Sequence, residues 1–397
     1  MRVVNGVRMA VLFLVVVALD ELAGVAYVGM PDVQASFATS TATTTLVVFT
    51  APSIFALLIE PWLILAAARR PDLRKAWVVG GLATMAAGML LAGFAPSPWV
   101  LALALGLAFL GSGLGTNLSQ VALMDAEPDA RETWMSRWVL AGEIGDIGTP
   151  ILLALLGWLT LGWREAFWII GGLLALHTVI LSLRTFPAPD TPLDEETPTL
   201  RGLLSGALSN PRLLAWLGAA MLCGLLDDAF TGFASLWLEQ TFSASLSTRG
   251  VVLLFGNLGA IAGITLSERL LRTGVSGRTI LVSSGTLACL ALIAWIAAPD
   301  LITSTIALAV LGGSVAPLWP LVKARAFDEH DGDGATVEAL SSALGLVEMG
   351  LPFLLGIVAD TVGLAFALVL IVTQPLAIVV LAIVDPRDVA APGETDD

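Results

Sequence analysis

Apolar segments long enough to cross a lipid bilayer recur along almost the whole length of this 397-residue chain. Hydrophobic residues make up 57% of the chain, charged residues make up 13%, and the mean hydropathy is +0.88. Soluble domains are less apolar than this, and a helix that spans a membrane needs about 20 mostly apolar residues. The sequence therefore predicts an all-α, polytopic membrane protein with little room for a soluble domain.

Twelve membrane-spanning helices are expected. The first apolar segment follows Arg2 and Arg8, as the apolar region of a signal peptide would, but carboxylates interrupt it and no clear small-residue cleavage site follows. We therefore interpret it as the first retained helix. The expected spans are 9–31, 44–66, 76–95, 98–122, 134–159, 165–184, 212–237, 249–271, 278–297, 301–322, 336–359 and 363–384.

The distribution of Lys and Arg supports this number of helices and orients them. With a cytoplasmic N-terminus, all of the 19 Lys and Arg residues except Arg164 and Arg249 fall in cytoplasmic segments or at cytoplasmic helix ends. Cytoplasmic segments of membrane proteins carry such an excess, and one miscounted helix would invert every later loop. We therefore expect both termini in the cytoplasm and the chain in the inner, or plasma, membrane of the cell.

The two halves of the chain contain similar short stretches in the same order. Leu19–Glu21 has a counterpart in Leu226–Asp228, and Asp146–Pro150 has a counterpart in Glu348–Pro352, at nearly the same offset. Matches that keep their order and offset indicate a repeated six-helix unit, as in transporters that bind substrate near the bilayer midplane between two repeats. The expected organisation is an N-terminal half at 1–185, a cytoplasmic linker at 186–211, a C-terminal half at 212–386 and a cytoplasmic tail at 387–397.

Short motifs carry a resemblance to a known family. GITLSERLLRTGVSGR (Gly263–Arg278) contains a glycine, an acid–arginine pair and further basic residues, whereas Ala56–Lys75 keeps Glu60 and a basic cluster but lacks the glycine and has Pro61 after the acid. AGEIGDIGTP (Ala141–Pro150) is rich in glycine and ends in proline. With the twelve spans and the central linker, these stretches resemble the major facilitator superfamily over essentially the whole chain. The resemblance implies secondary active transport by two pseudo-symmetric six-helix halves, and Ala141–Pro150 is similar to a motif of the family's antiporters.

Acidic residues lie near the middle of several expected spans, and no Lys or Arg lies at comparable depth. A charge at the bilayer centre costs about 2.5–3.5 kcal/mol on insertion scales, so such groups usually face a cavity or pair with a cation. Three explanations stay open: the acids are protonated, they lie in a wet cavity, or their positive partner is the substrate. A proton-coupled cation transporter combines these features. The acids are Asp20, Glu21, Glu143, Asp146, Asp227, Asp228 and Glu348.

Spacing divides the polar residues into expected roles. Adjacent helical residues point about 100° apart, so one acid of each neighbouring pair is expected to face the pathway and the other a neighbouring helix. Glu143 and Asp146 are three residues apart and share a face, as a coupled pair would, and Glu348 is the counterpart of Asp146. We predict substrate binding by Asp20, Glu21, Asp227, Asp228, Asn117 and Asn257, proton coupling by Glu143, Asp146 and Glu348, and gating by Glu60, Glu268 and Arg269.

These features predict a proton-coupled secondary active transporter that exports an organic cation or cationic amphiphile by alternating access, as a monomer without a cofactor or bound metal. Two alternatives stay open: transport of a divalent metal cation, for which carboxylates are suitable ligands, and proton-coupled uptake of a small neutral nutrient. A formal charge of −14 argues against nucleic-acid binding. Cys223 and Cys289 are expected to be small buried residues, and no nucleophile with a base, and no receptor output domain, is recognisable.

Overall fold

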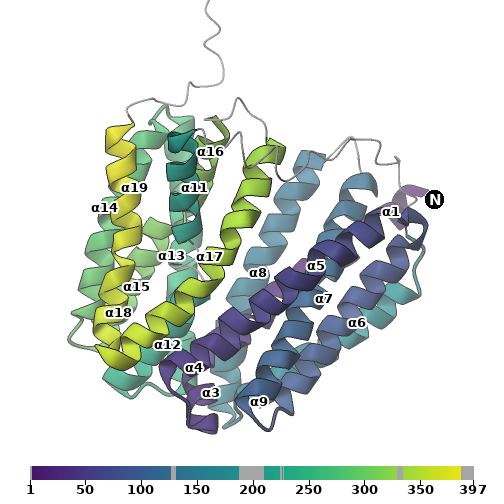
Figure 1. The fold of residues 1–397 in the computed structure, drawn as a ribbon, viewed down its shortest axis with the longest axis horizontal. Helices are drawn as coiled ribbons and strands as arrows, with labels where there is room; N and C mark the ends of the chain where they lie inside the picture. Colours follow the sequence, from purple (N-terminus) through teal and green to yellow (C-terminus); the bar gives the residue numbers. More distant parts are fainter. Residues whose placement is uncertain are drawn as a thin grey trace, which may run out of the picture. The chain divides into compact units, whose positions relative to one another are not determined.

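The computed structural model describes residues 2–126, 131–186, 210–223, 226, 228–328 and 334–385. Every regular element in these residues is a helix (Figure 1), and ten helical stretches are long and apolar enough to cross a bilayer. They coincide with ten of the twelve expected spans. The other two spans fall on α11 (Pro211–Cys223) with α12 (Asp228–Phe242), and on α17 (Gly334–Thr361). The expected tail and nearly all of the expected linker lie outside the described residues.

The chain divides into two compact units. Unit 1 comprises Met1–Glu195 and Ala244–Val251, and unit 2 comprises Glu196–Ser243 and Val252–Asp397. The division runs through α13 (Leu246–Arg272), so its first residues belong to unit 1 and the remainder to unit 2. One short segment, Ala244–Val251, therefore lies within the C-terminal half of the sequence but packs as part of unit 1.

Short connections separate the helices of unit 1. Ser40 caps α4 by accepting a hydrogen bond from the backbone N–H of Thr43 at 3.2 Å, which is the usual role of serine at a helix start. A π-helical turn at Leu46–Thr50 then joins α4 to α5. The helices are α1 (Arg2–Glu21), α2 (Val25–Val28), α3 (Met30–Phe37), α4 (Thr41–Thr45), α5 (Ala51–Ala68), α6 (Arg74–Gly93), α7 (Pro98–Ala126), α8 (Arg131–Trp158) and α9 (Trp163–Ser182).

The first span is not one continuous α-helix. α1 ends at Glu21, and a 3₁₀ turn at Leu22–Gly24 separates it from α2. Thr149 of α8 donates from its hydroxyl to the carbonyl of Glu21 at 3.2 Å and to that of Leu22 at 3.1 Å. These carbonyls lie where the α-helical hydrogen-bond ladder stops, so a donor from a neighbouring helix satisfies them inside the membrane.

An aromatic pair lies just beyond this break. Tyr27 of α2 stacks on Phe49 of the π-helical turn, with ring centroids 4.6 Å apart and ring planes at 7°. Aromatic pairs of this kind add about 0.5–1.5 kcal/mol beyond their buried area. The stack therefore fastens the second part of the first span to the start of the second span.

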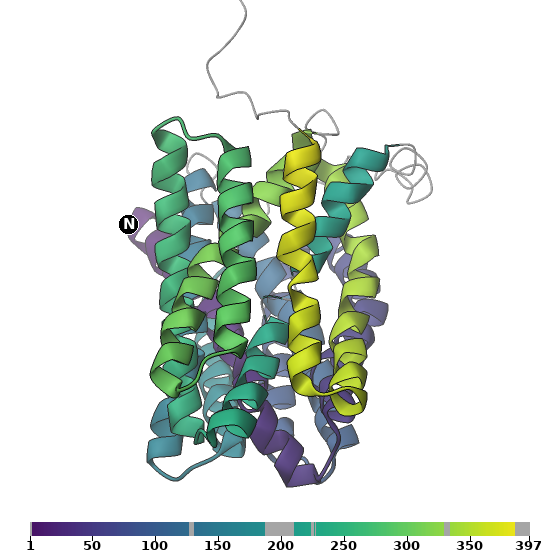
Figure 2. The same ribbon diagram turned by 90° about the vertical axis from the view of Figure 1, so that its left-hand side faces the viewer.

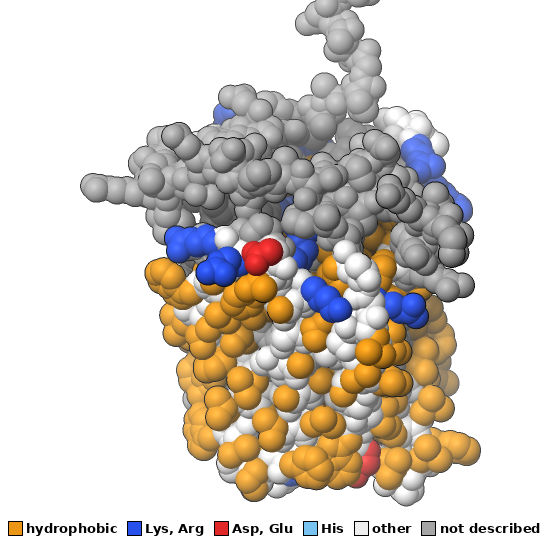
Figure 3. All heavy atoms as spheres, turned by 90° about the vertical axis from the view of Figure 1, so that its right-hand side faces the viewer, with side chains coloured by type: hydrophobic (Ala, Val, Ile, Leu, Met, Phe, Trp, Pro, Cys, Tyr) orange, Lys and Arg blue, Asp and Glu red, His pale blue; other side chains and the backbone are white. Residues whose placement is uncertain are grey.

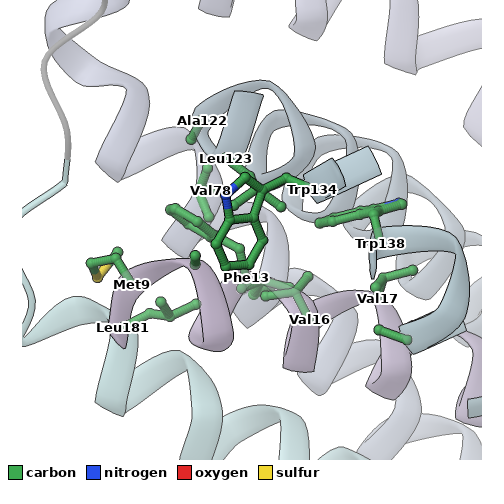
Figure 4. Packing of buried hydrophobic residues seen from close by; sticks show 13 residues of the cluster. Met9, Phe13, Val16, Val17, Val78, Ala122, Leu123, Trp134, Trp138 and Leu181 are labelled. Carbon is green, nitrogen blue, oxygen red and sulfur yellow. The ribbon is translucent and has the colours of Figure 1, made fainter. Parts of the chain in front are cut away.

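Buried hydrophobic side chains from five helices of unit 1 pack around Phe13 (Figure 4). Phe13 is 0% exposed, and its neighbours come from α1, α6, α7, α8 and α9. Because lipid is as apolar as a protein core, close packing rather than exclusion of water aligns helices in a membrane. The cluster consists of Met9, Ala10, Phe13, Val16, Val17, Val78, Leu82, Ala122, Leu123, Trp134, Trp138, Ala141 and Leu181.

Glycines let α6 and α7 approach each other closely. A Cβ at Gly81 would lie 2.5 Å from the backbone N of Gly115, and a Cβ at Gly88 would lie 2.6 Å from the backbone N of Ala108. There is no room for a side chain at either position, and small residues of this kind are typical of contacts between membrane helices. The contacts progress in opposite directions along the two helices, so the pair is antiparallel.

The helices of unit 2 run alongside one another (Figure 2), and α14 packs against both α15 and α19. α13 and α15 meet at glycines: a Cβ at Gly259 would lie 2.8 Å from the carbonyl carbon of Ala309, and one at Gly263 would lie 2.6 Å from that of Gly313. These contacts progress in the same direction, so this pair is parallel. Besides α11, α12, α13 and α17, the helices are α14 (Gly277–Ile296), α15 (Leu301–Val315), α16 (Leu318–Asp328), α18 (Leu364–Ile371) and α19 (Thr373–Val384).

The outer surface is that of a multi-pass membrane protein. Hydrophobic side chains cover much of the face in Figure 3, and Lys and Arg side chains gather in a band toward one end of it. Large apolar residues are exposed on long helices, among them Leu58, Leu103 and Leu176. Apolar flanks bounded by basic residues fit lipid tails and headgroups respectively.

The two basic residues that the topology leaves outside the cytoplasmic segments have partners within unit 1. Arg249 is 2% exposed and forms an ion pair with Asp32 of α3. Arg164 donates to two backbone carbonyls at the end of α6, at 3.0 and 2.8 Å, and its guanidinium lies 4.3 Å from the centroid of the Trp163 ring. Both charges therefore hold unit 1 together at the ends of its helices.

Candidate functional site

Asp20 is the second-last residue of α1, two residues before the 3₁₀ turn, and its side chain reaches α7. Its Oδ2 accepts a hydrogen bond from Ser112 Oγ at 2.8 Å. Thr116, one turn further along α7, lies beside the same carboxyl group. The Thr116 hydroxyl is buried and, in the part of the chain that the structure describes, makes no hydrogen bond of standard geometry. Within these residues, Asp20 thus meets two hydroxyls and no basic side chain.

Glu21, the neighbour of Asp20, lies along α8 instead. A Cβ at Gly145 would lie 2.8 Å from the Cβ of Glu21, and a Cβ at Gly142 would lie 3.5 Å from its Cγ. The two glycines therefore make room for the stem of this side chain, which is exposed beyond them. Asp20 and Glu21 diverge toward different helices, as adjacent helical positions must.

Glu60 of α5 lies against the same stretch of α7 as Asp20. Its Oε1 accepts a hydrogen bond from Asn117 Nδ2 at 3.3 Å. The three atoms nearest to the place where a Cβ on Gly113 would lie all belong to the carboxyl group of Glu60. Because Gly113 follows Ser112 directly, Asp20 and Glu60 touch adjacent residues of one helix.

Glu143 and Asp146 are half-buried on one face of α8. Gly142 and Gly145, which precede them, face α1, so the two acids are turned about 100° from that contact. The structure therefore keeps the expected pair together on a face of α8 other than the one that packs against Asp20's helix.

Unit 2 contains the remaining acids of the predicted site. Glu348 is half-buried on α17, four residues before Pro352, and Asn257 is half-buried on α13. Asp227 lies outside the described residues, and so does the side chain of Asp228. Their expected roles in binding and coupling stay predictions.

The expected gating residues of unit 2 lie at the end of α13. Glu268 forms an ion pair with Arg272, one helical turn away, and the two side chains are 58% and 76% exposed. Arg269 is exposed as well. Exposed pairs of this spacing contribute only about 0.3–0.5 kcal/mol, so this pair can open at little cost.

In the described part of the chain, no three His, Cys, Asp or Glu residues come together as metal ligands. Both cysteines are free, and Cys223 accepts a hydrogen bond from Gln374 Nε2 at 3.3 Å. The Nε2 of His177 lies 2.9 Å from the carbonyl of Leu12, so this ring joins α9 to α1. Cys223 is buried, as expected, whereas Cys289 is only half-buried, and the contacts of Cys223 and His177 join helices.

Two features of unit 1 escape sequence reasoning. Ser112 and Thr116 are polar residues spaced i, i+4 in an apolar helix, and this spacing marks the face of α7 that receives Asp20. The pairing of Asp32 with Arg249 has no local signal, because the two residues are 217 positions apart.

The sequence model of the Major Facilitator Superfamily matches residues 10–335. The chain belongs to the major facilitator superfamily. The match confirms both the resemblance drawn from the motifs and the predicted fold class. As a member of this family the chain is a transporter rather than an enzyme.

Solved structures of transporters share the fold of this major facilitator superfamily protein. A bacterial homologue of the human lysosomal transporter Spinster, in an inward-facing and unoccupied conformation, is 15% identical with a TM-score of 0.67, over 96% of this chain and 95% of that one. The nucleoside transporter NupG is 15% identical with a TM-score of 0.73, over 95% of this chain and 98% of that one. Likeness at such low identity shows the fold alone. A sequence search of curated proteins finds no significant match.

Proposed function

We propose that the chain is a proton-coupled secondary active transporter of the inner, or plasma, membrane that exports an organic cation or cationic amphiphile by alternating access. Protons move inward as the cation moves outward. Both termini are cytoplasmic, and the protein acts as a monomer without a bound metal or cofactor.

The environment of Asp20 carries this proposal. Asp20 lies in a helix apolar enough to span the membrane, and in the described residues its neighbours are the hydroxyls of Ser112 and Thr116. A hydroxyl can donate to a carboxylate but cannot neutralise it, so an acid at this depth needs a proton or a cation. A carrier that exchanges protons for a cation supplies each of them in turn.

Coupling is assigned to Asp146 with Glu143, and to Glu348. Asp146 and Glu348 each precede a proline inside a helix by four residues. Proline lacks the N–H that would close the helical ladder, which loosens the backbone at that turn and frees a carbonyl. Each acid therefore lies at a helical turn that lacks one backbone hydrogen bond.

A second candidate is proton-coupled uptake of a small neutral solute, in which the acids serve the proton alone. The nucleoside transporter NupG shares the fold, so the fold is compatible with such a solute. A third candidate is transport of a divalent metal cation, because carboxylates are suitable ligands for such ions.

Transport by the purified chain in proteoliposomes with an imposed pH gradient distinguishes these functions. Organic cations, a neutral nucleoside and Mn²⁺ are tested in parallel, with a protonophore to collapse the gradient. We expect the gradient to drive accumulation of organic cations and the protonophore to abolish it. Movement of the nucleoside, with cations neither transported nor competing, overturns the proposal.

The coupling assignment predicts a specific defect. Asp146→Asn and Glu348→Gln should abolish accumulation driven by the pH gradient, because neither side chain can then release a proton. Exchange of labelled for unlabelled substrate needs no net proton movement and should persist. Glu239→Gln, at an exposed position near the end of α12, is the matched control. Unchanged accumulation in both variants would show that the protons take another route.

A further inference from the structure

We propose that Asp20 and Glu60 form a single binding site on α7, and that this site takes cations bearing N–H groups, such as protonated amines, amidines and guanidines. The inference rests on the proposed function, because it names the class of cation that the transporter binds. It also gives Glu60 a role in substrate contact, in place of the gating role expected from its position near basic residues.

Both carboxyl groups contact one short stretch of α7. Ser112 donates to Asp20 at 2.8 Å, and the carboxyl of Glu60 occupies the space that a side chain at Gly113 would fill. Adjacent Cα atoms are about 3.8 Å apart, so the two carboxyl groups lie against neighbouring residues of one helix. The bound cation lies between them.

Thr116 adds a second observation that points to a ligand. Its residue is 6% exposed, its hydroxyl makes no hydrogen bond of standard geometry in the described residues, and it lies beside the carboxyl of Asp20. Buried polar groups nearly always have a partner. An N–H group of a bound cation that reaches the Asp20 carboxyl would meet the Thr116 oxygen as a second acceptor.

The other end of the site is open. Glu60 is half-buried, and Asn117, which donates to it at 3.3 Å, is exposed. The amide donor of Asn117 points to Glu60, so its carbonyl oxygen is the remaining acceptor of that side chain. A ligand at this end of the site meets the Glu60 carboxylate and the Asn117 amide.

The chemistry of these residues selects the kind of cation. Two carboxylates, a hydroxyl and an amide oxygen accept hydrogen bonds, so the site favours a positive ligand with several donors. A quaternary ammonium ion has no N–H and is usually bound by aromatic faces. The residues shown to contact the two carboxyls are serine, threonine, asparagine and glycine.

The test compares phenethylammonium with phenethyltrimethylammonium, which share a skeleton and a charge but differ in N–H groups. In proteoliposomes with a pH gradient, after subtraction of uptake by protein-free liposomes, through which the neutral amine diffuses, the unaltered chain should favour the primary amine in kcat/KM by roughly tenfold or more, the usual effect of hydrogen bonds to a charged group. Glu60→Gln should raise KM for both ions, because both lose an opposite charge, and should raise it more for the amine, roughly tenfold, because the amine also loses a charge-assisted hydrogen bond. Glu60→Asp should restore part of the preference.

Gly113→Ala tests the same contact without altering an acid. The new Cβ would displace the flexible end of Glu60, so the chain should fold normally and lose its preference for the amine. Gly80→Ala on α6, where no atom lies within 4 Å of a new Cβ, and Glu239→Gln are the controls. Size-exclusion profiles and thermal unfolding confirm that each variant is folded.

The outcomes separate this inference from the function on which it rests. If neither cation is transported, the proposed function fails. If both are transported equally well, or if Glu60→Gln and Gly113→Ala keep the preference for the amine, the site assignment fails while cation transport stands. A gate at Glu60 would slow both cations alike, and that result also overturns the assignment.

Discussion

Ser112 holds the carboxylate of Asp20 with a single hydroxyl at 2.8 Å, and the strength of this contact is measurable through transport. Hydrogen bonds to charged groups contribute about 1.5–3 kcal/mol. Ser112→Ala should therefore weaken binding of the transported cation by roughly tenfold or more, and Ser112→Thr, which keeps the hydroxyl, should not. The measurement is KM or competition in proteoliposomes. Equal affinities for the Ala and Thr variants would show that the hydroxyl does not position Asp20.

Asp300 lies outside the spans and caps α15. Its carboxylate accepts hydrogen bonds from the backbone N–H of Thr303 at 2.9 Å and from the Thr303 hydroxyl at 3.0 Å. The backbone bond above all, then the hydroxyl, holds the pKa of Asp300 below its ordinary value of 3.8. The carboxylate therefore stabilises the fold fully above the pKa of the unfolded chain, and this contribution is lost as the pH falls through the lower pKa of the folded chain.

Asp300→Asn keeps a capping oxygen but does not titrate. We expect the variant to lose less thermal stability than the unaltered chain when the pH falls from about 7 to about 3. Unfolding temperatures of both proteins in detergent, over a pH series, measure the difference. Parallel pH curves would assign the acid sensitivity to other carboxylates.

The sequence predicted where the helices lie, but it did not predict where a helix is interrupted. Length and apolar character predicted the spans because a bilayer demands about 20 apolar residues whatever surrounds them. The 3₁₀ turn after Glu21 was not predicted, since it depends on Thr149 of α8 to satisfy the freed carbonyls. The meeting of Asp20 and Glu60 on α7 was missed for a similar reason: Gly113 offers space that no periodicity reveals.

Helix contacts at glycine predict which elements resist substitution. Gly259→Ala would place a Cβ 2.8 Å from the carbonyl carbon of Ala309, so α13 and α15 must separate at a cost of about 1–3 kcal/mol. Gly218→Ala, on α11 with no atom within 4 Å of a new Cβ, should be neutral or slightly stabilising because alanine favours helix. Thermal unfolding of the two variants in detergent checks the contrast. A Gly259→Ala protein as stable as the control would show that α13 and α15 are not tightly apposed.

For the molecule as a whole, the family and fold were predictable because they depend on features repeated along the chain. The place of Ala244–Val251 in unit 1 was not, since it rests on contacts between distant residues. A Cβ at Gly157 of α8 would lie 2.5 Å from the backbone N of Ser247, and one at Gly250 would lie 2.5 Å from the carbonyl oxygen of Pro150. Such backbone contacts leave no trace in hydropathy.

The ion pair between Asp32 and Arg249 links Ala244–Val251 to α3. Its contribution to the free energy of unfolding can be measured. Arg249 is 3% exposed in its side chain and Asp32 is 33% exposed, so removing Asp32 leaves a buried charge and removing Arg249 leaves a partly exposed one. Arg249→Ala should lower stability by about 1–3 kcal/mol, and the further change Asp32→Ala should restore part of that loss. Chemical unfolding of both single variants and the double variant gives the coupling energy. Strictly additive effects would mean that the pair contributes nothing.

The stack of Tyr27 on Phe49 has a practical consequence. Tyr27 is the chain's sole tyrosine, and it lies in α2, just beyond the 3₁₀ turn that follows Asp20 and Glu21. Isotope-labelled tyrosine would therefore give a single set of ring resonances in a 397-residue membrane protein, shifted by the neighbouring aromatic ring. The native chain thus carries its own reporter on the interrupted helix, readable by magnetic resonance without an engineered cysteine or an attached dye.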